Sequence, residues 1–110
     1  MNTPSHRESR AKELLTHLAA EYLARESNRM PMITVTRADI SPDLKRASIY
    51  VSIFPDEQTS QALGYLARQN KHLRDFIAAK SKWRMLPLIS FVLDEGELNR
   101  QHLDEISRKP

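Results

Sequence analysis

The feature that most constrains the fold is a strict alternation over residues 47–54. Every second residue there is aliphatic, at Ala47, Ile49, Val51 and Ile53, and the residues between them are serine or aromatic. Successive side chains of a β-strand point to opposite faces, so this pattern predicts a strand with one apolar face. We therefore expect the chain to contain a β-sheet with one apolar side.

A second strand is predicted just before this one. Residues Ile33 to Ile40 are rich in β-branched side chains, and their alternation changes phase between Val35 and Ala38, which indicates a β-bulge. Ser41-Pro42-Asp43 follows and has turn chemistry. The two strands are expected to pair as an antiparallel hairpin with a moderately long connection.

Apolar residues at helical spacing predict an amphipathic helix before the hairpin, from about Arg7 to Arg25. Its start has a capping-box pattern, with Ser5 three residues before Glu8. The residue before Pro31 avoids helical angles, so the helix should end before that proline. The stripe expected to face the core is Ala11, Leu14, Leu15, Leu18, Tyr22 and Leu23.

A second helical segment is predicted after the hairpin, from about Thr59 to Lys80. Helical steps along its apolar stripe reach Asn70, a poor helix former that tolerates left-handed backbone angles. We therefore predict a break between two helices at Gln69-Asn70-Lys71. The alternative is one continuous helix in which Asn70 is a hydrogen-bonded polar residue.

A third strand is predicted near the C-terminal end, because Ile89, Phe91 and Leu93 alternate after Pro87. Apolar residues between Leu98 and Ile106 then indicate a short closing helix. The expected order is α-β-β-α-α-β with a C-terminal helix. This is an α+β fold with a three-stranded sheet and the helices on one face.

That order, with a basic helix-break-helix before the last strand, is the type II KH arrangement. At 110 residues the chain has the usual size of one domain. We expect a single KH-like domain over residues 1–110, with its core at about residues 7–106.

Positive charge is concentrated in one segment, residues 64–93. Six basic residues and one acidic residue give this segment a charge of +5, although the whole chain carries only +3. Charge confined to one segment is typical of a surface that binds a polyanion, whereas a solvated helix face is the alternative interpretation. The six residues are Arg68, Lys71, Arg74, Lys80, Lys82 and Arg84.

Several function classes are disfavoured. The chain has no cysteine, which excludes a disulfide framework, a thiolate zinc site and a cysteine nucleophile. The four histidines lie far apart and lack metal-ligand spacing, and no nucleophile or phosphate-loop motif is present. We therefore expect no enzyme activity, no metal and no cofactor.

The expected compartment is the cytoplasm. No apolar run approaches the roughly 20 residues that a membrane-spanning helix needs. Residues 1–10 are polar and lack the apolar segment of a signal peptide.

A family resemblance rests on several segments in a characteristic order and spacing. They are Asp43-Leu44-Lys45-Arg46-Ala47 with Tyr50-Val51-Ser52, Leu73-Arg74-Asp75-Phe76-Ile77, and Trp83-Arg84-Met85-Leu86-Pro87-Leu88-Ile89-Ser90-Phe91 with Asp94. In these segments the chain resembles the ribosome-binding factor A family, over about residues 7–106. Two positions depart from the family pattern. The family usually has Ala-x-Gly at the kink, where this chain has Gln69-Asn70-Lys71, and Glu after the proline, where it has Leu88.

The resemblance implies a ribosome assembly factor. Such a factor binds 16S rRNA and the free 30S subunit, assists small-subunit maturation and promotes processing of the 5′ end of precursor 16S rRNA. It implies a monomer off the ribosome. Two other functions remain open: a DNA-binding helix-turn-helix module formed by residues 59–80, and a protein-interaction domain with a basic docking face.

The candidate RNA-binding residues follow from charge, because the chain has no Gly-x-x-Gly clamp. If the chain breaks at Asn70, free amides near Lys71 and His72 would form a phosphate site. Trp83 is interpreted first as a lid on the core, with base stacking as the alternative. The candidate set is Arg68, Lys71 and Arg74, continued by Lys80, Lys82 and Arg84 and joined by Lys45 and Arg46 from the hairpin.

Overall fold

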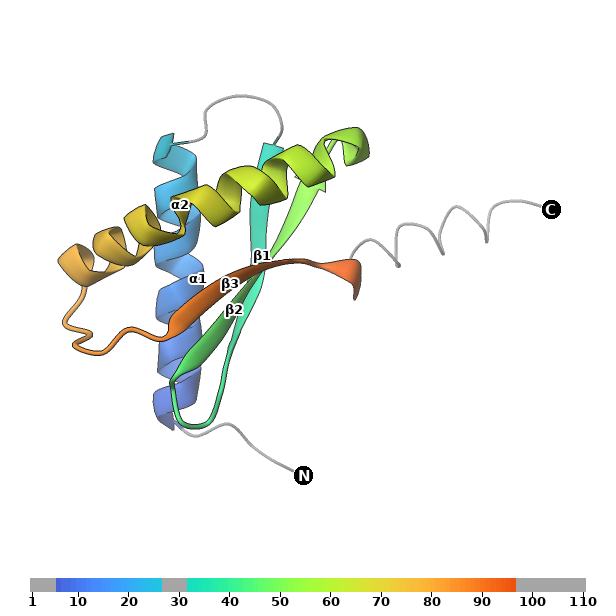
Figure 1. Ribbon diagram of the computed structural model, residues 1–110. Coiled ribbons are helices and arrows are strands. Elements are labelled where there is room, and N and C mark those ends of the chain that lie inside the picture. Colours follow the sequence, from blue (N-terminus) through green and yellow to red (C-terminus); the bar gives the residue numbers. More distant parts are fainter. Residues whose placement is uncertain (1–5, 27–31, 97–110) are drawn as a thin grey trace.

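Two long helices and a three-stranded sheet make up the computed structural model, which describes residues 6–26 and 32–96 (Figure 1). The predicted closing helix at residues 98–106 lies outside these ranges. No helix in the described ranges is both long and apolar enough to span a membrane. The elements are α1 (His6–Glu26), β1 (Met32–Ile40), β2 (Arg46–Phe54), the short 3-10 helix η1 (Asp56–Gln58), α2 (Thr59–Lys80) and β3 (Leu88–Leu93).

The predicted hairpin and its bulge are confirmed. β1 and β2 pair antiparallel, and their register shifts between Val35 and Arg37, so that Thr36 is the extra residue. The Thr36 hydroxyl donates to Asp94 Oδ2 at 2.6 Å, which ties the bulge to the end of β3. The phase change in the sequence therefore marks a real irregularity with a tertiary partner.

β3 lies parallel to β2 and forms an edge of the sheet, whose strand order is β1-β2-β3. A parallel pair needs a long crossover connection, and α2 supplies it. The backbone N–H of Leu88 donates to Lys45 O at 2.9 Å, toward the hairpin. Backbone groups of successive strand residues point to opposite sides, so the carbonyl of Ile89 points to the free edge of the sheet.

Both helices cover the same face of the sheet, as predicted. In Figure 1 they cross one another, with α1 packed against β1 and α2 against β3. The alternating residues of β2 are buried beneath them, and on α2 Leu66, Leu73 and Ile77 are completely buried. On the other face Arg37 stacks 3.7 Å above the ring of Tyr50.

The predicted break at Gln69-Asn70-Lys71 is wrong, because α2 is one continuous helix of 22 residues. Asn70 does not bend the chain; its Nδ2 donates to the free-edge carbonyl of Ile89 at 2.7 Å. Gln69 accepts a hydrogen bond from the Tyr22 hydroxyl of α1 at 2.6 Å, and Lys71 is exposed. Asn70 and Gln69 thus interrupt the apolar stripe because each has a partner in a neighbouring element.

Candidate nucleic-acid interface

Arg68, Lys71 and Arg74 form a basic strip on α2, which we call the helix face. Side chains three residues apart on an α-helix point in directions that differ by about 300°, or about 60° in the opposite sense. The three side chains therefore lie on one side of the helix. Arg68 and Lys71 are exposed. Arg74 is half-buried, and its Nε is enclosed without a hydrogen-bond partner among the described residues. Since α2 is unbroken, Lys71 and His72 do not begin a helix, and the predicted backbone amide site is absent there.

Lys80 lies on a different side of α2, against α1. Its Nζ is 3.5 Å from Glu21 Oε2 and 5.6 Å from the centre of the Phe76 ring. Arg25 of α1 approaches the same ring and the same carboxylate. The structure therefore separates Lys80 from the helix face and engages it with an acidic partner.

Two segments that meet at the hairpin end of the sheet carry four basic residues, Lys45, Arg46, Lys82 and Arg84, which we call the loop cluster. The first two belong to the hairpin, and the other two to the loop between α2 and β3. The Leu88–Lys45 backbone bond and the pairing of Arg46 with Leu88 join these segments. All four basic residues are exposed. Two predicted groups that lie nearly 40 residues apart in the chain thus share one end of the molecule.

Hydrogen bonds that involve the side chains of Ser41 and Asp43 stabilise the hairpin loop. The Ser41 hydroxyl donates to Asp43 Oδ1 at 2.6 Å, and the Lys45 amide donates to the same oxygen at 3.0 Å. These bonds lower the pKa of Asp43, the Ser41 hydroxyl most strongly and the Lys45 amide next. Leu44 has a left-handed backbone with φ of 61°, which costs roughly 1 kcal/mol in a residue with a side chain. The hydrogen bonds of Ser41 and Asp43 thus stabilise this conformation of the loop.

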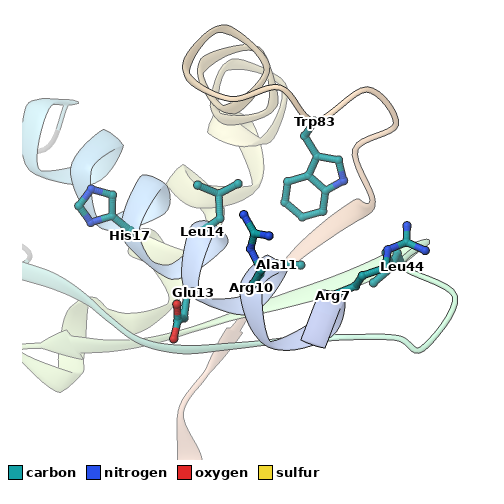
Figure 2. A pocket seen from close by; sticks show the side chains of 8 residues that line it. All are labelled: Arg7, Arg10, Ala11, Glu13, Leu14, His17, Leu44 and Trp83. Atoms are coloured by element: carbon teal, nitrogen blue, oxygen red, sulfur yellow. The ribbon is translucent and has the colours of Figure 1, made fainter. Parts of the chain in front are cut away.

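A groove of about 540 Å³ opens beside the loop cluster (Figure 2). Three segments meet there: the first turns of α1, the hairpin tip and the loop that carries Trp83. Arg7 and Arg10 lie on its rim and are not among the basic residues predicted from the sequence to bind RNA. The sequence shows two arginines at helical spacing near a helix start, but only the packing of α1 reveals what they face. The lining residues are Arg7, Arg10, Ala11, Glu13, Leu14, His17, Leu44 and Trp83.

Within the described ranges, no group of three or more histidine, aspartate or glutamate side chains could hold a metal ion. The described basic surfaces can bind anions, because exposed guanidinium and ammonium groups donate hydrogen bonds to phosphate oxygens.

Comparisons with known proteins agree with the fold. A family model described as ribosome-binding factor A matches residues 7–107. Ribosome-binding factor A of Methylocella silvestris is 34% identical over 112 residues, which cover 97% of this chain and 72% of that protein. The crystal structure of ribosome-binding factor A from Thermus thermophilus has 29% identity and a TM-score of 0.68, over 78% of this chain and 94% of that one.

A second similar structure is a homology model of the Thermus thermophilus factor, fitted into a cryo-EM map of a 30S complex. It has 29% identity and a TM-score of 0.59, and it covers 80% of this chain and 91% of that one. The resemblance found in the sequence is confirmed despite the unbroken α2. On the match of the family model to nearly the whole chain, the protein belongs to the ribosome-binding factor A family.

Proposed function

We propose that this protein binds the free 30S subunit through 16S rRNA and assists its maturation. Membership of the family supports this function, as does the placement of a homologous factor in the map of a 30S complex. We further propose that the protein acts as a single cytoplasmic KH-like domain, monomeric off the ribosome. Processing of the 5′ end of precursor 16S rRNA would be promoted by holding immature rRNA in one arrangement.

The observation that carries the proposal is the convergence of the loop cluster. The hairpin and the loop after α2 both carry exposed basic side chains, and the backbone bond from Leu88 to Lys45 joins the two segments. Basic residues gathered on one part of the surface are the electrostatic footprint typical of a nucleic-acid-binding site. The described residues hold no backbone clamp between two helices, so phosphate contacts would come from side chains.

The helix face is proposed as the second part of the contact surface. Arg68 and Lys71 are exposed and form no ion pair within residues 6–26 and 32–96, whereas Lys80 pairs with Glu21. Lys80 would contact phosphate only by giving up that carboxylate, so we expect the smallest contribution from it. Release would follow when the mature subunit no longer presents the bound arrangement.

The DNA-binding alternative has lost its structural basis, because residues 59–80 form one helix rather than a helix-turn-helix. A protein-interaction domain with a basic docking face remains the competing function. It predicts association with ribosomal proteins that does not depend on rRNA.

Sedimentation of the full-length protein with ribosomal particles tests the function. We expect it to follow the 30S peak and to be absent from 50S and 70S particles. We also expect protein-free 16S rRNA fragments to compete for it, whereas duplex DNA of equal length should compete poorly. If the protein still sediments with 30S in an excess of 16S rRNA fragments, the protein-interaction function would be favoured.

Double substitutions that each remove two positive charges locate the surface. Lys45→Gln with Arg46→Gln, Lys82→Gln with Arg84→Gln, and Arg68→Gln with Lys71→Gln should each weaken 30S binding, roughly tenfold or about 1.4 kcal/mol. The matched control is Lys12→Gln with Arg25→Gln, because these cations face Asp39 and Glu21. Equal losses in the control would show that only net charge matters. Arg74 is left unchanged because it is half-buried.

A further inference from the structure

The groove at the start of α1 combines aromatic and apolar walls with a basic rim (Figure 2). Ala11, Leu14 and Leu44 line it together with Trp83, whose ring reaches from the loop after α2 toward α1. At about 540 Å³ the groove lies within the range of small-ligand sites, about 300–1,000 Å³. It is large enough for a planar group to enter beside the indole.

Trp83 is positioned by the end of α2. The Ser81 hydroxyl donates to Ile77 O at 2.7 Å and accepts from the Trp83 amide at 3.2 Å. Ser81 itself is extended and ends the helix. On the facing side, the hydrogen-bonded hairpin holds Leu44 in its left-handed conformation. The backbones of Trp83 and Leu44 are therefore tied to the end of α2 and to the hairpin, and both side chains pack against the core.

Charge on the rim favours an anion. Arg7 and Arg10 are exposed, His17 lies further along α1, and among the described lining residues Glu13 is the one acidic side chain. The loop cluster continues from Leu44 and Trp83, because Lys45, Lys82 and Arg84 are their immediate neighbours in the chain. A strand of phosphates bound to the loop cluster would pass the mouth of the groove.

We propose that the groove receives one unpaired nucleotide of the bound RNA. Its base stacks on Trp83, and its flanking phosphates contact Arg7 and Arg10. Every base has a face that can stack on an aromatic side chain, and proteins commonly bind splayed-out bases of single-stranded RNA in this way. An acidic protein segment would pair with the two arginines through its carboxylates but would leave the indole without a stacking partner. This inference rests on the proposed rRNA binding and adds the site where one base is held.

The chain contains one tryptophan, so its fluorescence reports on this groove alone. The full-length protein is titrated with tetra-adenylate RNA, and in parallel with an abasic strand that carries the same phosphates. We expect saturable quenching of Trp83 by tetra-adenylate, at least fivefold stronger at equal occupancy than by the abasic strand. Equal quenching by the two strands, or none by either, would overturn the proposal.

Two sets of variants separate stacking from charge. Arg7→Gln with Arg10→Gln should raise the apparent Kd for tetra-adenylate roughly tenfold and leave the maximum quench unchanged. The charge-matched variant Lys12→Gln with Arg25→Gln should change neither the Kd nor the maximum quench.

The stacking variants are measured with labelled RNA and anisotropy as the readout. Trp83→Phe should retain its affinity for RNA, whereas Trp83→Leu should bind at least fivefold more weakly. Thermal unfolding checks that each variant is folded. Equal affinity of the Phe and Leu variants would contradict stacking.

Other occupants give distinct outcomes. A fluorescence shift caused by an acidic amphipathic peptide but not by RNA would replace the nucleotide with a protein segment. A shift that depends only on protein concentration would indicate a second copy of the chain. Both results overturn the nucleotide proposal. In the 30S complex, Trp83 should become less accessible to acrylamide, measured on protein that carries the selectively excited analogue 5-hydroxytryptophan at this position. If the protein sediments with 30S but Trp83 stays equally accessible, the groove proposal fails while the proposed function stands.

Discussion

The helix face and the loop cluster carry similar charge but are built in different ways. Arg68, Lys71 and Arg74 lie on one continuous helix, and their spacing follows directly from the sequence. The loop cluster joins the hairpin to the loop after α2 and borders the groove. The helix face is a convex strip of charge, whereas the loop cluster adjoins a concave site with an aromatic wall.

This difference shows that the density of charge along a chain does not locate the most structured binding surface. The helix face comes from the most basic segment, yet it offers only charge. The loop cluster draws half of its charge from outside that segment and gains a neighbouring groove through tertiary packing. Shape as well as charge contributes to recognition of folded RNA, so the loop cluster should contribute more to selectivity and the helix face more to general affinity.

The strongest test of the comparison removes the support beneath the helix face. Leu73 is a completely buried residue of α2, and Leu73→Ala should reduce the free energy of unfolding by about 2–5 kcal/mol, measured in urea. The control Leu88→Ala removes the same atoms from a residue that is 67% exposed, on the strand beside the loop cluster, and should cost much less. If the two variants lost similar free energies of unfolding, α2 and its helix face would not depend more on core packing than the strand beside the loop cluster does.

The next test concerns the polar residue that replaces the predicted break. Asn70→Ala removes the bond to the Ile89 carbonyl and should destabilise the protein by about 1 kcal/mol, although alanine is the better helix former. Gln61→Ala, at an exposed position of the same helix, serves as the control and should be neutral or slightly stabilising. Stabilisation by Asn70→Ala would show that its tertiary bond contributes nothing.

The salt dependence of 30S binding sharpens the comparison of the two surfaces. Each phosphate contact contributes a slope of roughly −0.7 to −0.9 in log affinity against log salt. The helix-face and loop-cluster double variants should each reduce the slope by roughly 1.5, but only the loop-cluster variants should also reduce discrimination between 16S rRNA and a polyanion. Equal discrimination in all variants would mean that the two surfaces act alike.

Acid should loosen the hairpin loop and leave the helix face unchanged. Folding lowers the pKa of Asp43, so the ionised carboxylate stabilises the folded state. This stabilisation is present above the ordinary carboxyl pKa, about 4, and is lost as pH falls through the lowered pKa. Hydrogen exchange of the Lys45 and Arg46 amides should therefore be unchanged above about pH 5 and lose protection below about pH 4, after correction for intrinsic exchange. Asp43→Asn should show the same loss at neutral pH, and Asp56→Asn should not.

The smallest effect is expected at Lys80, which lies on neither surface. Its pair with Glu21 is partly exposed, so Lys80→Gln should change the free energy of unfolding by at most about 0.5 kcal/mol. It should reduce the salt slope of 30S binding less than Lys82→Gln does. An equal reduction would place Lys80 among the phosphate contacts.

Local patterns predicted the strands and the extent of both helices, including the bulge after Val35, because alternation and helical periodicity are local properties. They failed at Asn70, since its partner is a backbone carbonyl 19 residues away, which no local pattern displays. The groove was missed for the same reason: Arg10, Leu44 and Trp83 meet only in the folded chain. The RNA-binding roles of the basic residues stay predictions.

The Asn70–Ile89 bond also bears on self-assembly. A strand at the edge of a sheet offers free N–H and C=O groups to any extended chain, which makes it a template for aggregation. β3 is such a strand, and the carbonyl near its start is already occupied by a side chain of the helix that packs beside it. An incoming strand would first have to displace that amide and move α2. Asn70 therefore helps to keep a partly apolar edge closed to strand addition.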